Sequence, residues 1–190
     1  MLTLEQKNNN ELKFMELLTK LNIDLTEVSK FLDQIDYFNK PASTQYVGAY
    51  PGGLCEHALL TAHELGVLCN AYYPGRYTEE DVIKVAFFKD IYKATMYEAY
   101  LKNVKDEETG QWNSVPAYRT RESNSRPVFG DLGFSSYMQI KNLIPLTDEQ
   151  IEAIIHSKPS EFAPDIHEIL RTYPLVTLTR MSEIASTYLT

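Results

Sequence analysis

The chain has 190 residues, of which 44% are hydrophobic, 23% charged and 12% aromatic, and its formal net charge at pH 7 is −8. This length and composition predict a single globular domain, residues 1–190, with its own hydrophobic core. Binding to duplex nucleic acid irrespective of sequence is not expected, because that affinity comes from Lys and Arg side chains that neutralise phosphates. No apolar run approaches the roughly 18 to 20 residues of a membrane span. The N-terminus lacks the order of a signal peptide and the two cysteines fit a reduced compartment, so we expect a cytoplasmic protein.

Apolar spacing predicts helices through the first half of the chain. Two N-terminal helices are expected within about 11–40, the second of them capped by Thr26. A Pro-Gly-Gly turn precedes a third helix at about 54–72. The stretch from Val82 to Tyr100 then reads as a buried helix, although Lys89-Asp90 places a cation beside an anion in its apolar run.

That fourth helix is expected to open with Thr78 and Asp81 as a capping box. From about 97 to 121 the pattern changes, because two segments flank the polar turn KDEETG, and this predicts a β-hairpin. Further helices are expected from about Gly133, after a capping box of Thr147 and Gln150, and at the C-terminus. The predicted fold class is mainly α, a helical bundle with an inserted hairpin.

Four residues are candidates for a mixed histidine and carboxylate site. His57 lies one helical turn after a Gly-Gly turn, and His156 ends the capped helix after two isoleucines. Asp90 and Asp131 are the acidic residues in the most apolar or turn-like surroundings. Such ligands bind a divalent ion and activate water. The alternative is that all four are satisfied core or surface groups.

Seven segments, in this order and with these spacings, resemble the HD-domain phosphohydrolases of phages and bacteria: YFNKPAST, GAYPGGLCEHALL, VAFFKDIYK, KNVKDEETGQWNSVPAY, PVFGDLGFSSYM, IPLTDEQIEAIIH and YPLVTLTRMSEIAS. The resemblance runs from about Asp36 to Ser186. It implies an all-α core in which histidines and aspartates from different helices bind one or two divalent metals. It also implies hydrolysis of phosphoester bonds in nucleotides or nucleic acids by metal-activated water.

The metal-binding pattern of that family is only partly present. The resemblance places His57, Asp90 and His156 at ligand positions, and Lys93 agrees with the family pattern. Four positions depart from it: Lys89 replaces the histidine of the His-Asp pair, Asp131 stands where a histidine is usual, Ser182 replaces an aspartate, and Val47 stands where an upstream histidine is common.

Lys89 changes the expected chemistry, because a protonated lysine donates hydrogen bonds and cannot ligate a metal. One hypothesis is that its ammonium replaces the charge of the metal and pairs with Asp90 and with Asp131. The other is that Lys89 points outward from a helix edge.

Two functions follow from the resemblance. The first is a catalytically impaired binder of a nucleotide or other phosphorylated ligand, which needs no cofactor and uses Lys89, Lys93 and Arg126. The second is an active phosphohydrolase with a reduced site of His57, Asp90, Asp131 and His156. In that case one divalent ion (Mn, Mg, Co, Ni or Fe) is needed, and Asp90 and Lys93 are the catalytic residues.

Overall fold

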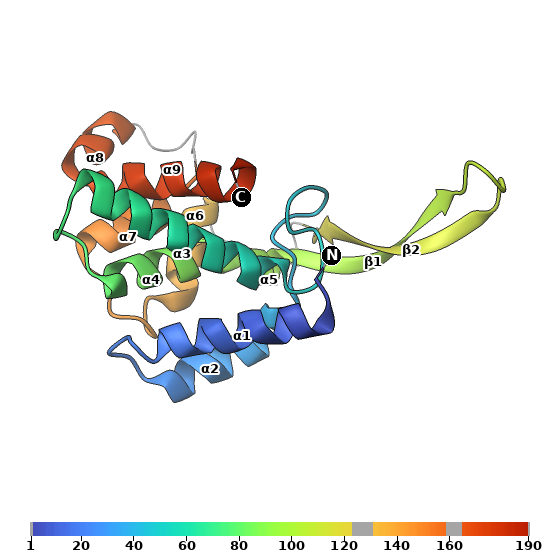
Figure 1. Ribbon diagram of the computed structural model, residues 1–190, viewed down its shortest axis with the longest axis horizontal. Coiled ribbons are helices and arrows are strands. Elements are labelled where there is room, and N and C mark those ends of the chain that lie inside the picture. The colour runs from blue at the N-terminus through green and yellow to red at the C-terminus, as the bar shows by residue number, and fades with distance from the viewer. Residues whose placement is uncertain (1, 123–130, 159–164, 190) are drawn as a thin grey trace.

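The computed structural model describes residues 2–122, 131–158 and 165–189, and these form a mainly helical body with a two-stranded antiparallel hairpin (Figure 1). The predicted combination of helices and a hairpin is confirmed. No helix in these described ranges has the length and apolar character needed to cross a membrane. In chain order the elements are α1 (Leu4–Leu18), α2 (Leu25–Gln34), the 3-10 turn η1 (Tyr37–Asn39), α3 (Gly53–Tyr72), α4 (Glu79–Phe88), α5 (Tyr92–Met96), β1 (Tyr97–Lys105), β2 (Trp112–Thr120), α6 (Leu132–Ile140), α7 (Asp148–Ile155), α8 (Ile166–Thr172) and α9 (Pro174–Tyr188).

Side-chain caps fix where several helices begin. The predicted capping boxes are present at α4, where Thr78 pairs with Asp81, and at α7, where Thr147 pairs with Gln150. The predicted cap of α2 was wrong. The carboxylate of Asp24 accepts hydrogen bonds from the Thr26 and Glu27 amides and so begins the helix earlier.

Two further helix boundaries differ from the prediction. A capping box of Thr3 and Gln6 starts α1 at Leu4, although the polar run at its beginning carries no apolar periodicity. Helix α8 lies in a segment for which no helix was predicted. This short helix has no side-chain cap and no fully buried residue, so it lacks the signals on which sequence prediction depends.

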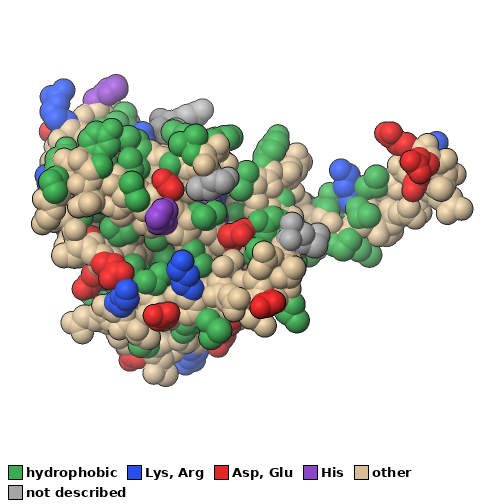
Figure 2. Space-filling view, viewed as in Figure 1, with side chains coloured by type: hydrophobic (Ala, Val, Ile, Leu, Met, Phe, Trp, Pro, Cys, Tyr) green, Lys and Arg blue, Asp and Glu red, His purple; other side chains and the backbone are tan. Residues whose placement is uncertain are grey.

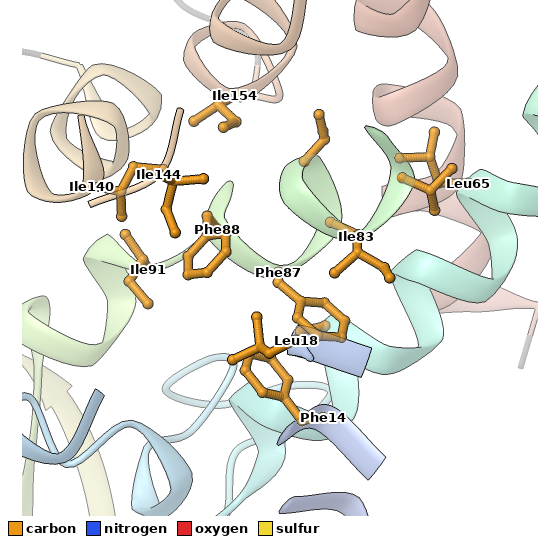
Figure 3. Close-up of a cluster of buried hydrophobic side chains, with 14 of the residues drawn as sticks. Phe14, Leu18, Leu65, Ile83, Phe87, Phe88, Ile91, Ile140, Ile144 and Ile154 are labelled. Atoms are coloured by element: carbon orange, nitrogen blue, oxygen red, sulfur yellow. The ribbon is translucent and has the colours of Figure 1, made fainter. Parts of the chain in front are cut away.

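Helix α3 lies at the centre of the body and packs against α1, α4 and α9. The core forms where these helices meet (Figure 3). Phe14 of α1 stacks on Phe87 of α4 with ring centroids 3.9 Å apart, and Leu65 of α3 is fully buried. Helix α7 covers the other side of α4 and contacts α6 and α9.

The segment from Val82 to Ala94 is buried at every position, as the sequence predicts, but it is not one continuous helix. Helix α4 ends at Phe88 and α5 begins at Tyr92. Ser136 of α6 holds the break between them, because its hydroxyl donates to the Lys89 carbonyl at 2.8 Å and accepts from the Tyr92 amide at 3.3 Å. The break turns the side chains of Lys89 and Asp90 into the body.

The hairpin has the predicted extent, with Tyr97 opposite Thr120 and Lys105 opposite Trp112. Gly110 closes the turn with a positive φ of 71°, which favours glycine. The Arg121 amide donates to the Met96 carbonyl at 2.9 Å and so joins the end of β2 to α5. Beyond its base the hairpin projects away from the helices (Figure 1).

A substitution at Gly133 tests how closely α6 approaches α7. A Cβ atom at this position would lie 2.0 Å from the Ile155 carbonyl oxygen. Gly133→Ala is therefore expected to lower the free energy of unfolding by roughly 1–3 kcal/mol, measured by urea denaturation. The control is Gly66→Ala inside α3, where the nearest atom is Val82 Cγ1 at 3.9 Å. There we expect a gain of up to about 1 kcal/mol from helix propensity. Equal stability of the two variants would contradict the packing described.

Candidate functional site

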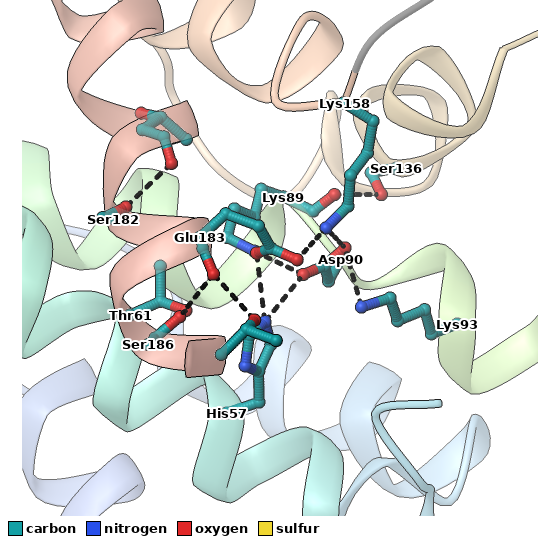
Figure 4. Close-up of polar contacts among 12 residues, drawn as sticks. His57, Thr61, Lys89, Asp90, Lys93, Ser136, Lys158, Ser182, Glu183 and Ser186 are labelled. Atoms are coloured by element: carbon teal, nitrogen blue, oxygen red, sulfur yellow. Dashed lines mark hydrogen bonds and ion pairs between the residues drawn. The ribbon is translucent and has the colours of Figure 1, made fainter. Parts of the chain in front are cut away.

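A buried network of ions lies where the α4–α5 break meets α3 and α9 (Figure 4). At its centre is Lys89, and 0% of the surface of this residue is exposed to solvent. Its ammonium donates to Oδ2 of Asp90, the next residue, and to Oε2 of Glu183 on α9. The cation thus lies between carboxylates supplied by two different segments of the chain.

His57, in the second turn of α3, contacts the same two carboxylate oxygens. Its Nε2 lies 3.0 Å from Oε2 of Glu183 and 3.5 Å from Oδ2 of Asp90. Near this point the hydroxyls of Thr61 on α3 and Ser186 on α9 lie 3.2 Å apart. Polar contacts therefore join α3 to α9 beside the ion network.

Two more lysines contact the other oxygens of these carboxylates. Lys93 Nζ, from α5, lies 3.3 Å from Oδ1 of Asp90. Lys158 Nζ, just after α7, lies 3.6 Å from the same oxygen and donates to Oε1 of Glu183. The network therefore holds three ammonium groups and two carboxylates, and one positive charge is in excess when His57 is neutral.

The charges in the network shift one another's pKa values. Burial alone would raise the pKa of Asp90, but the three surrounding ammonium groups hold it well below its ordinary value. The pKa of Glu183 is also lowered, chiefly by Lys89. Burial opposes the charge of Lys89, yet its two carboxylate partners raise its pKa. Burial lowers the pKa of Lys93 to about 8, and the neighbouring ammonium groups add to that effect.

A cavity of about 300 Å³ opens beside the network, between the loop before α3 and the end of α9. Its lining comprises His57, Lys93, Glu183, Ser43, Thr187, Ala42, Tyr46, Val47 and Tyr188. A larger cavity of about 510 Å³ lies between α1, α3 and α4, but no residue of the ion network lines it. The smaller cavity is the one with buried charged groups in its wall, so it is the candidate binding site.

The structure brings together only part of the predicted set. His57 and Asp90 are close, and together with Glu183 they offer donor atoms within 4.8 Å of one another. Asp131 and His156 are not in this group. The carboxylate of Asp131 caps α6 by accepting from the Leu132 amide at 2.6 Å.

The other predicted residues also have defined places. His156 Nε2 lies 3.1 Å from a carboxylate oxygen of Glu152, one turn earlier on α7. The side chain of Lys89 points inward, and its second partner is Glu183, not Asp131 as hypothesised. Lys93 lines the cavity. Arg126 lies outside the described residues.

Glu183 and Lys158 are the residues of the network that sequence reasoning missed. The resemblance directed attention to Ser182, whose buried hydroxyl donates to the Thr179 carbonyl at 2.8 Å. The carboxylate comes from the next residue along the helix. Glu183 lies eight residues after the buried Leu175 and four after the buried Thr179, so helical periodicity places it beside the core-facing stripe. A charged side chain at that spacing is the signal that identifies it.

No family model matches the chain, and comparison with curated proteins and with solved structures found no match. The chemistry of the site must therefore be inferred from its own residues.

The donor set can be compared with the needs of a divalent metal. One imidazole and two carboxylates are ligands that such ions accept. However, the oxygens that lie closest to His57 also accept from the Lys89 ammonium. An ion bound there would have to displace that ammonium or deprotonate it, so the site with charged Lys89 does not fit a metal.

Replacing Lys89 with methionine tests the role of its charge. Lys89→Met keeps the length of the side chain but removes the hydrogen bonds that the ammonium donates to Asp90 and Glu183, while Lys93 and Lys158 remain near these carboxylates. We expect a loss of roughly 1–3 kcal/mol in the free energy of unfolding at pH 7, measured with urea. The double variant Lys89→Met/Glu183→Gln removes one cation and one anion and leaves Asp90 beside Lys93 and Lys158, so it should recover part of the loss.

Lys84 provides a matched control for that variant. It is also a buried lysine, but it donates to the Pro145 carbonyl at 2.8 Å and pairs with the more exposed Glu80. Lys84→Met should cost less than Lys89→Met. If the two variants have equal stability, the inference that Lys89 is the central cation of the network is wrong.

The lowered pKa values of Asp90 and Glu183 predict a loss of stability in acid. Below about pH 4 the unfolded chain binds protons at these groups, whereas the folded chain binds fewer. The contribution of these two carboxylates to the free energy of unfolding is therefore complete above that pH and declines as the pH falls through it. Melting curves from pH 7 to pH 2.5 should show a steeper decline for the wild type than for Lys89→Met/Glu183→Gln, which lacks one of the two carboxylates. Parallel curves would contradict the assignment.

Proposed function

We propose that the chain is an HD-domain-like protein in which the Lys89 ammonium replaces the metal, and that it binds a phosphorylated small molecule without hydrolysing it. The observation that carries this proposal is the contact of one buried ammonium with both Asp90 and Glu183. In the family that the sequence resembles, a divalent ion holds such carboxylates together. Here a covalently attached cation performs that structural task.

The net charge of the ion network supports the proposal that the ligand is an anion. The three lysines exceed the two carboxylates by one positive charge, and this excess lies in surroundings of low dielectric, where charge interactions are strong. Lys93 belongs both to the network and to the cavity wall. The oxygens of a phosphate can accept hydrogen bonds from its ammonium.

The size and lining of the cavity support a small ligand. Its volume of about 300 Å³ is at the lower end of the range for small-molecule pockets. Hydroxyl groups of Ser43 and Thr187 lie in the wall and provide further hydrogen-bonding partners. A phosphate beside Lys93 would therefore have polar contacts, while the rest of the ligand extends toward Tyr46 and Tyr188.

Metal-activated hydrolysis is disfavoured by the same lysine. Water becomes a strong nucleophile at neutral pH when a divalent cation lowers its pKa. The ammonium of Lys89 repels such a cation and contacts the oxygens that would ligate it. On this proposal the residues of the site bind and orient an anion but generate no nucleophile.

A metal-dependent phosphohydrolase is the second candidate, favoured by the three donors of His57, Asp90 and Glu183 that lie within 4.8 Å. A panel of nucleotides incubated with Mn²⁺, Mg²⁺, Co²⁺ or Ni²⁺ distinguishes the two. Release of phosphate or nucleoside by the wild type, lost in Asp90→Asn, would support the hydrolase and overturn the proposal of a binder.

Metal content is expected to depend on Lys89. Wild-type protein purified without a chelator should contain much less than one transition-metal ion per chain by elemental analysis. Lys89→Met frees the three donors from the ammonium and should take up more Mn²⁺ or Zn²⁺ from solution. A stoichiometric metal in the wild type, or equal uptake by both proteins, would show that the ammonium does not replace an ion.

Phosphate should stabilise the folded protein through Lys93. A ligand at ten times its dissociation constant stabilises by about 1.4 kcal/mol, which corresponds to a rise of about 3–5 °C in the melting temperature. We expect such a rise with millimolar inorganic phosphate, pyrophosphate or AMP, relative to chloride at the same ionic strength. The rise should disappear in Lys93→Met.

The control for Lys93→Met is again Lys84→Met, since both residues are 7% exposed but Lys84 does not line the cavity. Lys84→Met should keep the full phosphate-induced shift. A shift retained in Lys93→Met would place the anion elsewhere.

A further inference from the structure

The outer part of the hairpin, residues 101–116, forms an arm that extends beyond the helical body (Figure 1). Every residue of the arm except Asp106 is exposed. Two of its largest apolar side chains face solvent almost completely, since Leu101 is 69% and Trp112 70% exposed. An arm that buries none of its apolar side chains against its own body requires an explanation.

The strand register gathers these apolar groups on one face. Leu101 is directly opposite Pro116, and Lys105 is opposite Trp112. Because side chains alternate between the faces of a sheet, all four lie on the same side. Between these pairs, the Ser114 hydroxyl donates to the Asn103 side chain at 2.7 Å, so the polar groups in the middle of this face satisfy each other.

A two-stranded hairpin is marginally stable by itself in water. Among the described residues, β1 and β2 form a sheet only with each other. Exposed apolar surface rimmed by polar groups marks sites of protein association. These features together indicate that another protein surface covers the arm.

We propose that the arm binds the same arm of a second copy of this chain, related by a two-fold axis. Charge supports this choice of partner. Lys105 lies on the apolar face of the arm and Glu107 and Glu108 at its tip, and Figure 2 shows acidic side chains gathered at the tip.

Two antiparallel arms that overlap along this face bring Lys105 of each copy toward the glutamates of the other. One arm thus carries both halves of a self-complementary contact, as an interface with two-fold symmetry requires. The carboxylate of Asp106 is not available for that contact, because it accepts from the Glu108 and Thr109 amides within the turn.

The size of the arm predicts a weak dimer. The strand parts of the arm have five residues each and extend about 17 Å, and two strands are about 10 Å wide, so one face offers roughly 170 Å². A stable interface buries about 800 Å² per partner. The arms therefore associate reversibly, and the dimer should become populated only at high micromolar concentration.

Sedimentation equilibrium at 5–500 µM protein and low salt tests the proposal. The average mass should rise from 21.8 kDa toward twice that value as concentration increases. Leu101→Ser/Trp112→Ser should weaken association at least tenfold, whereas the control Leu4→Ser, at a 75% exposed position on α1, should leave it unchanged. A monomeric wild type at 500 µM, or unchanged association of the double variant, would overturn the proposal.

A charge exchange tests the pairing of the arms directly. Lys105→Glu gives an arm that is acidic both on this face and at its tip, and Glu107→Lys/Glu108→Lys gives one that is basic at both places. Each variant should remain monomeric alone, and an equimolar mixture should associate. Failure of the mixture to associate would overturn the two-fold arrangement. Circular dichroism should show the same helical signal for all variants, since every substitution on the arm lies outside the core.

Discussion

The structure of the site depends on one buried charge, the ammonium of Lys89, which lies between the carboxylates of Asp90 and Glu183. A buried carboxylate without a partner costs several kcal/mol, and two such groups close together repel each other. Because the two carboxylates come from the α4–α5 break and from α9, the lysine also fixes how these segments meet. The surrounding groups take their arrangement from this contact: His57 lies against the same oxygens, and Lys93 and Lys158 lie against the others.

The proposed replacement of a metal ion by Lys89 has distinct physical consequences. An ammonium carries one charge, donates three hydrogen bonds and cannot dissociate from the protein. It neutralises only half of the charge of two carboxylates, and the two additional lysines reverse the sign of the balance. The result is a site with excess positive charge next to a cavity, which suits an anion. The same change removes the Lewis acid that hydrolysis by metal-activated water needs.

The sequence allowed much of the fold to be predicted because the relevant signals are local. Capping boxes at Thr78 and Thr147 and the polar turn of the hairpin depend on residues close together in the chain. The burial of Val82–Ala94 follows from its composition. Helix α1 began earlier than predicted because a capping box at Thr3 can start a helix in a run without apolar periodicity.

The site was harder to predict because its partners are far apart in the chain. The pairing of Lys89 with Asp90 was predicted, since the two are neighbours. The pairing of Lys89 with Glu183 joins residues 94 positions apart, and only the packing of α9 brings them together. Asp131 was a reasonable candidate by its position after a glycine, but its carboxylate is used as a helix cap. The motif therefore identified the correct helix, α9, through Ser182. The geometry of that helix decides that the neighbouring residue, Glu183, points into the network.

The central claim is that Lys89 carries a fixed positive charge in the place of a metal ion. The most direct measurement is the pKa of its amine, followed by the chemical shifts of the side-chain carbon and nitrogen next to the charge in lysine-labelled protein, with Lys89→Met to assign the signal. We expect Lys89 to keep its proton at pH values where an exposed lysine begins to lose its own, because the carboxylate partners raise the pKa of Lys89. The signal should also be unaffected by equimolar Mn²⁺. A Lys89 amine that is neutral at pH 7, or a signal that one equivalent of Mn²⁺ broadens beyond detection, would contradict this account.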